Sequence, residues 1–208
     1  MVAPEGRSTV LFVVVATLIS AFVGWGVNVE LFRLAAILFL VFLIFCLNFF
    51  RDPARKIPAG ENLVLSPADG KVVDVSATDS GEKKVSLFLS VFDVHRNRTP
   101  VNGKVTRVNY EKGSFLAAFK TEASEINEHN DVEIESEAGI VRVRQIACIL
   151  ARRIICHLRE GQEVKGGESL GFIRFGSRTD LILPASARLT VRVGDRVEGG
   201  SSVLGELH

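Results

Sequence analysis

Gly161-Gln-Glu-Val-Lys-Gly-Gly-Glu-Ser-Leu-Gly171 is the stretch that decides the fold of this chain, because the sequence contains a second copy of it. That copy is Gly194-Asp-Arg-Val-Glu-Gly-Gly-Ser-Ser-Val-Leu-Gly205. A shorter pair, Asp69-Gly70-Lys71-Val72 and Asn102-Gly103-Lys104-Val105, repeats upstream. Glycine supplies the positive φ that tight hairpin turns require. The repeats therefore predict similar halves built from short strands and glycine turns.

The residues around these repeats also favour strands. Val85 to Phe92 is rich in β-forming residues, and Ala187 to Val193 alternates apolar and polar residues. Shorter runs of the same kind are centred on Val72, Val105, Val132, Val141, Phe172 and Ile182. Apolar residues at helical spacing between Ser114 and Asn127 predict one short helix, with Ser114 as its N-cap.

The glycine hairpins resemble those of lipoyl and biotinyl carrier domains, which are small sandwiches of pseudo-symmetric halves. The resemblance implies a mainly β fold, a sandwich of lipoyl-like halves with minor helix. It also raises an alternative function, a carrier domain or a membrane adaptor that contains one. A carrier needs an acceptor lysine in a Met-Lys-Met-like context, but Met1 is the only methionine. Lys71 and Lys104 follow Asx-Gly turns without that context.

Two apolar runs precede this region, at residues 10–27 and 34–50. A membrane-spanning helix needs roughly 20 mostly apolar residues, with about 17 as the lower limit. Both runs meet that limit, and the residues between them, Asn28 to Arg33, suffice for a tight turn. Residues 1–51 are therefore predicted to form an α-helical transmembrane hairpin. A cleaved signal peptide and a pair of buried soluble helices are the alternatives.

The basic residues next to the apolar runs predict the orientation of this anchor. Arg7 precedes the first run, and Arg51, Arg55 and Lys56 follow the second. Cytoplasmic flanks carry an excess of lysine and arginine. Both ends of the hairpin are therefore expected inside, with residues 52–208 on the cytoplasmic face of the cell membrane.

Composition excludes several other classes of protein. With 25 basic and 24 acidic residues, the net charge is +1, which does not suggest a nucleic-acid binder. The three cysteines, Cys46, Cys148 and Cys156, form neither a disulfide framework nor a recognisable metal site. We expect reduced thiols and no metal.

Three separate segments carry the chemistry. They are Ser66-Pro-Ala-Asp-Gly70, Phe92-Asp-Val-His-Arg96 and Ile173-Arg-Phe-Gly-Ser-Arg178. Together they resemble the phosphatidylserine decarboxylase family in its short, prokaryotic-type form. The resemblance covers roughly residues 52 to 185, and other shared segments are Asn127–Asn130, Gln145–Ala147 and Ala151–Ile154.

The resemblance implies that the chain cuts itself between Gly176 and Ser177. The hydroxyl of Ser177 would attack the carbonyl of Gly176, with His95 as the base and Asp69 orienting it. Elimination and hydrolysis would leave Ser177 as a pyruvoyl group, the enzyme's built-in cofactor. Gly176-Ser177 alone predicts nothing, since a Gly-Ser pair is usually a turn.

In turnover, the resemblance implies that the pyruvoyl ketone forms a Schiff base with the serine headgroup of phosphatidylserine. Carbon dioxide then leaves and phosphatidylethanolamine is released, with His95 as a candidate proton donor. An ether-linked relative of the substrate, archaetidylserine, stays open as an alternative.

Candidate substrate contacts are Arg96, Arg98, Arg152 and Arg153 for the phosphate or carboxylate, and Phe115 and Phe119, with Leu116 and Lys120, for the bilayer surface. The large and small fragments are expected to stay associated. Homodimers are common in the family.

Two departures from the long-form family pattern affect the assignment of roles. The second histidine of a His-x-x-His motif is replaced by Arg98, and the cut site reads Phe175-Gly-Ser-Arg178 instead of Leu-Gly-Ser-Thr. His95 must therefore serve both processing and turnover, or another group must help. His129 ranks below His95 as that group.

Overall fold

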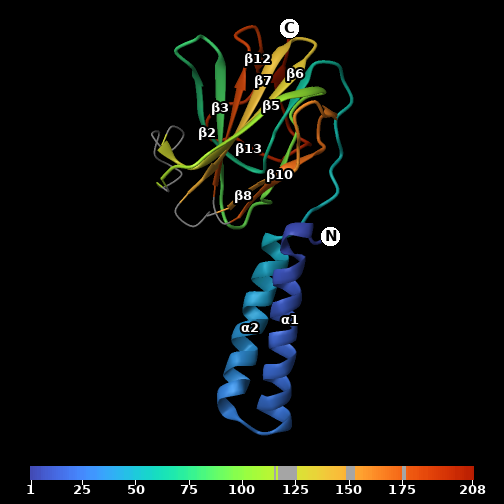
Figure 1. The fold of residues 1–208 in the computed structure, drawn as a ribbon, viewed down its shortest axis with the longest axis vertical. Helices are drawn as coiled ribbons and strands as arrows, with labels where there is room; N and C mark the ends of the chain where they lie inside the picture. Colours follow the sequence, from blue (N-terminus) through green and yellow to red (C-terminus); the bar gives the residue numbers. More distant parts are fainter. Residues whose placement is uncertain (115, 117–125, 149–152, 175–176) are drawn as a thin grey trace. The chain divides into compact units, whose positions relative to one another are not determined.

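The computed structural model describes residues 1–114, 116, 126–148, 153–174 and 177–208 (Figure 1). The chain divides into two compact units, Met1–Pro53 and Ala54–His208. The predicted helix between Ser114 and Asn127 lies almost wholly outside the described residues.

The first unit is a helical hairpin, as predicted. A short 3-10 turn η1 (Pro4–Gly6) leads into α1 (Arg7–Ala21), which ends in a π-helical turn η2 (Phe22–Gly26). The returning helix is α2 (Glu30–Phe49), so the connection is shorter than the predicted six residues. Gly24 permits this tight turn, because a Cβ there would lie 2.7 Å from the backbone nitrogen of Arg33.

The surface of this hairpin is apolar on most sides. Pro4–Gly26 and Glu30–Phe49 are long and apolar enough to cross a membrane, and only a small share of either helix is buried. Phe12 and Phe22, for example, are 70% and 72% exposed. A helix that is apolar all round needs a core or a bilayer to cover it. Within the first unit, most of each helix surface is left exposed, which is compatible with membrane association.

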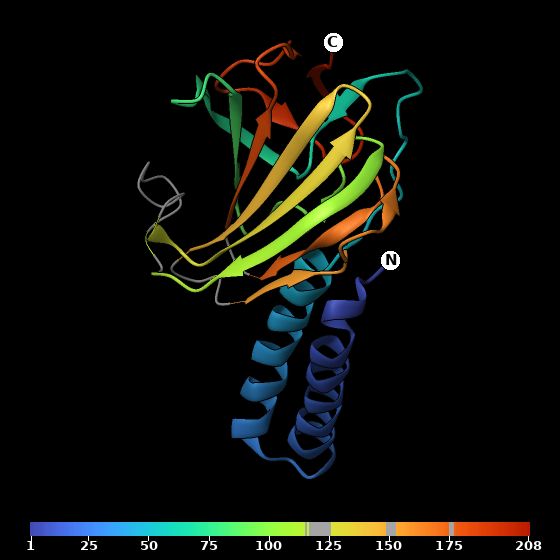
Figure 2. The same ribbon diagram turned by 45° about the horizontal axis from the view of Figure 1, so that its top comes forward.

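The second unit is mainly β, as predicted. Its strands are β1 (Leu63–Leu65), β2 (Gly70–Ala77), β3 (Lys83–Leu89), β4 (Arg96–Arg98), β5 (Gly103–Glu111), β6 (His129–Ser136), β7 (Gly139–Ala147), β8 (Arg153–Cys156), β9 (Glu163–Val164), β10 (Ser169–Arg174), β11 (Ser177–Leu183), β12 (Arg188–Leu189), β13 (Arg196–Val197) and β14 (Val203–Glu206). One sheet has eight strands in the order β13-β2-β3-β11-β7-β6-β5-β9 and curls around the core (Figure 2). The smaller sheets are β1-β14-β12 and β4-β10-β8.

Two predicted strands are shorter than their sequence patterns. The run from Val85 to Phe92 ends as β3 at Leu89, because the next residues turn and Asp93 N–H bonds to the carbonyl of Ser90 at 2.9 Å. The run from Ala187 to Val193 gives only β12. Arg192 there already belongs to a turn, closed by Asp195 N–H on the Arg192 carbonyl at 3.1 Å.

The sequence repeats occupy the opposite ends of the large sheet. At one end β13 pairs with β2 so that Val197 faces Gly70, and at the other β9 pairs with β5 so that Val164 faces Gly103. Further bonds repeat as well. Val72 N–H reaches the carbonyl of Asp195, and Val105 N–H that of Gln162, each at 2.9 Å. The two repeats thus make equivalent backbone contacts at opposite ends of the sheet.

The segments next to the two repeats also bond to each other. Leu65 N–H bonds to the carbonyl of Pro100, and Arg98 N–H bonds to the carbonyl of Pro67, both at 2.8 Å. This reciprocal pair lays the segment that leads to Asp69 beside β4, which follows His95. Two of the three chemical segments are therefore held together by backbone hydrogen bonds.

The core lies within the curled sheet and is aliphatic. It includes the fully buried residues Val72, Val85, Leu87, Leu89, Val105, Val132, Ile134, Val141, Val143, Leu181 and Leu183. Strand β11 is central to it, because Arg178 and Thr179, which alternate in direction, are both buried. A strand buried on both faces and paired on both edges is difficult to displace.

Gly103 tests the packing of one repeat. Its φ is +156°, and an added Cβ would lie 2.2 Å from the carbonyl oxygen of Glu135. We expect Gly103→Ala to lower the free energy of unfolding by about 1–3 kcal/mol, because the strands must separate to admit the methyl group. Thermal unfolding of the full chain in detergent measures this loss.

Gly81→Ala is the control for this substitution. Gly81 has a φ of +83° but no atom within 4 Å of an added Cβ, so only backbone strain, about 1 kcal/mol, applies. Equal losses in the two variants would contradict the close approach at Gly103.

Candidate active site

Ser177 lies at the junction between two sheets. It is the first residue of β11, and its backbone pairs with Leu89 on β3 and Ala147 on β7. The preceding strand β10 ends at Arg174 and belongs to the small sheet β4-β10-β8. Gly176 and the side chain of Ser177 lie outside the described residues. Both strand partners of Ser177 are fully buried, so the start of β11 lies in apolar surroundings.

His95 lies beside the strand that leads to this junction. It directly precedes β4 and is fully buried. Its carbonyl accepts a hydrogen bond from Ile173 N–H at 3.2 Å, and its ring centroid is 6.4 Å from that of Phe172. Ile173 precedes Ser177 by four positions in the chain. The fold therefore brings His95 to the segment in which the cut is predicted.

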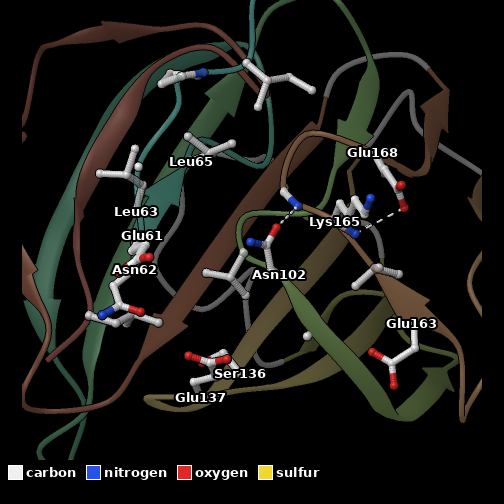
Figure 3. A pocket seen from close by; sticks show the side chains of 18 of the residues that line it. Glu61, Asn62, Leu63, Leu65, Asn102, Ser136, Glu137, Glu163, Lys165 and Glu168 are labelled. Atoms are coloured by element: carbon white, nitrogen blue, oxygen red, sulfur yellow. Dashed lines mark hydrogen bonds between the residues drawn. The ribbon is translucent and has the colours of Figure 1, made fainter.

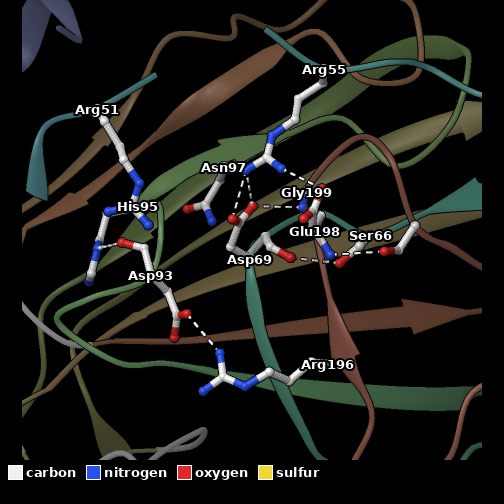
Figure 4. Close-up of polar contacts among 12 residues, drawn as sticks. Arg51, Arg55, Ser66, Asp69, Asp93, His95, Asn97, Arg196, Glu198 and Gly199 are labelled. Carbon is white, nitrogen blue, oxygen red and sulfur yellow. Dashed lines mark hydrogen bonds and ion pairs between the residues drawn. The ribbon is translucent and has the colours of Figure 1, made fainter. Parts of the chain in front are cut away.

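The ring of His95 is oriented by a backbone group. Its Nδ1 lies 2.9 Å from the carbonyl oxygen of Asp93. A carbonyl only accepts, so Nδ1 carries the proton, and in the neutral ring Nε2 is the basic nitrogen. The carboxylate of Asp93 fixes this turn, accepting from Ser90 N–H at 2.8 Å. It also accepts from Arg196 at 3.1 Å (Figure 4). Sequence reasoning missed this role of Asp93, although its place two residues before the histidine was a signal.

Asp69 is held by two donors. Its Oδ1 accepts from Gly199 N–H at 2.8 Å, and Nη2 of Arg55 lies 2.7 Å from both carboxylate oxygens (Figure 4). Burial raises the pKa of Asp69, while the Gly199 N–H and the Arg55 guanidinium oppose that rise. Among the described residues, the Asp69 carboxylate accepts from Gly199 N–H and Arg55, and Nδ1 of His95 bonds to the Asp93 carbonyl. Orientation of His95 by Asp69 therefore stays a prediction.

A chain of buried side-chain amides joins the chemical segments. Asn130 donates to Gln145 at 3.1 Å, and Gln145 donates to Asn97 at 2.7 Å. Asn97 then donates to Thr179 on β11 at 3.3 Å and contacts the carbonyl of Pro67 at 3.5 Å. The amide side chains and Thr179 are all nearly or fully buried. Satisfied buried networks of this kind fix a unique arrangement, here of the segments that carry Asp69, His95 and Ser177.

The predicted substrate arginines differ in their surroundings. Arg96 is 8% exposed and donates to the hydroxyl of Ser169 at 2.8 Å, while Arg98 donates to the carbonyl of Gly167 at 3.0 Å. Arg153 is exposed on β8. Arg152, Phe115 and Phe119 lie outside the described residues.

Strand register adds a further arginine to this set. Arg174 on β10 pairs directly with Arg153 on β8. Two arginines therefore lie at directly opposite positions of neighbouring strands, and guanidinium groups are suited to bind anionic groups. The sequence did not indicate Arg174, because its proximity to Arg153 depends on the register of two strands.

The surroundings of His129, which ranked below His95, and of the buried thiol Cys148 fit a structural role. Nδ1 of His129 on β6 is 2.7 Å from the carbonyl of Asn127. Burial raises the pKa of the Cys148 thiol to about 11, so this thiol stays protonated and unreactive at neutral pH.

A cavity of about 810 Å³ lies at the other repeat, next to the turn that contains Asn102 (Figure 3). Glu61, Glu163 and Lys165 also line it. None of the predicted site residues does so. The chemical segments are thus gathered at the Asp69 repeat, and the cavity marks its pseudo-symmetric counterpart.

Comparison with known proteins agrees with this arrangement. The sequence pattern of the family described as phosphatidylserine decarboxylase matches residues 42–205. The chain belongs to this family. The phosphatidylserine decarboxylase proenzyme of Paraburkholderia xenovorans is 42% identical over 214 aligned positions, which cover all of this chain and 97% of the relative. The proenzymes of Paraburkholderia phymatum and Burkholderia pseudomallei are 41% and 42% identical over all of this chain and 97% and 95% of theirs.

Membership of the phosphatidylserine decarboxylase family covers both units. The relatives align with the helical hairpin as well as with the β unit. The family pattern itself begins within α2 and includes Asp69, His95 and Ser177.

Proposed function

We propose that this chain is a membrane-anchored, self-processing decarboxylase. It would convert phosphatidylserine to phosphatidylethanolamine and carbon dioxide with a pyruvoyl group made from Ser177. The observation that carries the proposal is the position of buried His95, bonded to β10 just before the junction at which Ser177 begins β11. The relatives' name of proenzyme agrees with processing.

Processing needs only groups of this chain and water. The hydroxyl oxygen of Ser177 attacks the Gly176 carbonyl carbon, the amide C–N bond breaks, and the nitrogen takes a proton, which leaves an ester. Removal of the Ser177 α-proton then expels the Gly176 carboxylate, and hydrolysis of the dehydroalanine releases ammonia. Nε2 of His95 is the proposed base for these proton transfers, because Nδ1 is committed to the Asp93 carbonyl.

The fragments of such a cut would stay together. The small fragment, residues 177–208, contains β11 to β14. β11 pairs with β3 and β7, β13 pairs with β2, and β14 pairs with β1, all of which belong to the large fragment. The new N-terminus would therefore be held in the centre of the large sheet.

In turnover, a pyruvoyl group at Ser177 supplies an electron sink for decarboxylation, the role that pyridoxal phosphate has elsewhere. Leu89, Ala147 and Phe172 exclude water from this position, since all three are fully buried. His95 would return a proton to the α-carbon. Arg153 and Arg174, with Arg96 nearby on β4, are the proposed contacts for the anionic headgroup.

The hairpin supplies access to a lipid substrate. We assign residues 1–51 as the anchor and residues 52–208 as the catalytic domain on the cytoplasmic face. The count of basic residues supports this orientation: Arg33, in the first turn of α2, is the basic residue near the connection, while Arg7 begins α1 and Arg51, Arg55 and Lys56 follow α2 at the other end. The fragments, the bilayer and a second copy of the chain are the proposed partners.

The test uses the purified full chain in detergent. Denaturing gels and intact mass should show two fragments, of which the smaller begins with a blocked pyruvoyl terminus and reacts with phenylhydrazine. Phosphatidylserine in mixed micelles should lose carbon dioxide. A parallel assay with an ether-linked serine lipid shows whether the enzyme distinguishes acyl from ether chains or recognises the headgroup alone. A single uncut chain without a hydrazine adduct would contradict the proposal, and a modified Lys71 or Lys104 would favour the carrier alternative.

A further inference from the structure

The two repeats contain the same turn with different acceptors. Gly199 N–H bonds to the carboxylate of Asp69, and Gly166 N–H bonds to the amide oxygen of Asn102, each at 2.8 Å. A neutral amide therefore suffices to hold this turn. The charge of Asp69 needs another explanation.

The charged turn differs from its counterpart by a bound arginine. Nη2 of Arg55 lies 2.7 Å from both oxygens of Asp69, and the two side chains are only 8% and 13% exposed. Nη1 of Arg55 reaches Glu198, which is 65% exposed, at 2.7 Å. In the other repeat Lys165 follows Val164, where Glu198 follows Val197 here. The turn at Asp69 thus carries two acidic residues, Asp69 and Glu198, where the equivalent turn carries a neutral Asn102 and a basic Lys165.

We propose that Arg55 is a positioning residue for self-processing, which holds the carboxylate of Asp69 ionised and oriented for its role at the cut. The proposal rests on the function proposed above. Oδ1 of Asp69 accepts from both Gly199 N–H and Arg55, while Oδ2 accepts from Arg55 alone. Each carboxylate oxygen has about two acceptor positions, so Oδ2 can take one further donor from the processing site.

Arg55 also offsets the cost of burying this carboxylate. Burial raises the pKa of Asp69, and Glu198 adds to the rise. Arg55 and the Gly199 N–H act in the opposite direction, and Arg55 is the only cation among the described groups that shift Asp69. Without Arg55, the acid form of Asp69 persists to higher pH, and an acid form cannot act as a charge partner or proton acceptor.

Arg55 belongs to the linker between the hairpin and β1. The same linker packs Ile57 against Gly167. A Cβ added at Gly167 would lie 2.8 Å from Cδ1 of Ile57. This linker is therefore docked on both repeats. The Arg55 side chain is only 8% exposed, so its guanidinium is held at the Asp69 turn.

The test follows the rate of cutting in the newly made full chain, synthesised in the presence of phospholipid vesicles, from pH 6 to pH 9. We expect Arg55→Gln to cut about tenfold more slowly than wild type at the acid end of this range and to recover as the pH rises, since a carboxyl group with a raised pKa is less ionised at low pH. Arg55→Lys should cut at a rate between those of wild type and Arg55→Gln, because lysine keeps the positive charge but lacks the planar guanidinium that binds both carboxylate oxygens. Asp69→Asn should keep the turn, because Asn102 accepts the same hydrogen bond in the equivalent turn. This variant should nevertheless stay uncut at every pH, since it has no carboxylate.

Arg142→Gln is the matched control, since it breaks a part-buried pair with Glu133, 3.1 Å apart, elsewhere in the large sheet. It should cut at the wild-type rate. The inference is overturned if Arg55→Gln cuts as fast as wild type throughout, or is slow without recovery at high pH, as a purely structural role would require. Failure of the wild-type chain to cut would instead overturn the proposed function.

Discussion

Ser177→Ala is expected to yield one uncut chain that forms no hydrazine adduct and does not decarboxylate phosphatidylserine. Without the hydroxyl there is no nucleophile for the Gly176 carbonyl and no precursor of the ketone. The loss of activity should be on the order of 10⁴-fold or more, as for other covalent nucleophiles. The fold should persist, because residue 177 is held by backbone pairs to Leu89 and Ala147.

Ser201→Ala is the matched control for this prediction. Gly200-Ser201 is another Gly-Ser bond of the chain, in the turn between β13 and β14, where Ser201 N–H bonds to the carbonyl of Glu198 at 3.1 Å. This variant should be cut and active like wild type. Normal fragments from Ser177→Ala would mean that another serine is the precursor. The measurements are intact mass and release of labelled carbon dioxide.

The parts of the fold that sequence predicted are those set by local chemistry. Four glycines of the repeats have positive φ: Gly161, Gly167, Gly194 and Gly200. The repeated glycines in the sequence therefore predicted the positions of the turns. The hairpin followed in the same way from two apolar runs without charged residues. By contrast, the strand predicted from Ala187 to Val193 is wrong beyond Leu189, because alternation of apolar residues says nothing of where the chain turns.

The sequence named candidate reactive residues but not their hydrogen-bond and ion-pair partners. Arg55 was assigned to the membrane flank, yet folding places it on Asp69. Gln145 and Asn97 are 48 positions apart, and their bond depends on how two sheets pack. Likewise the acceptor for His95 is a carbonyl, which every residue possesses and no sequence pattern marks. Contacts of this kind arise from tertiary structure, and the sequence carries no local signal for them.

His95→Ala is expected to lower the rate of cutting by about 10²- to 10⁴-fold and to abolish turnover, because Nε2 is the proposed base in both steps. His129→Ala separates this effect from the loss of a buried ring. His129 is 5% exposed and has the same kind of contact, with Nδ1 2.7 Å from the carbonyl of the residue two positions before it.

The two variants, assayed side by side for fragment formation and for carbon dioxide release, give distinct results. Slow cutting and lost turnover in His95→Ala alone would assign both steps to His95. Normal cutting with lost turnover would restrict His95 to decarboxylation and leave Asp69, kept charged by Arg55, as the main group for processing. Wild-type rates of cutting and of carbon dioxide release in His95→Ala would show that His95 has no role in either reaction. Its contacts with Phe172 and Ile173 would then serve packing only.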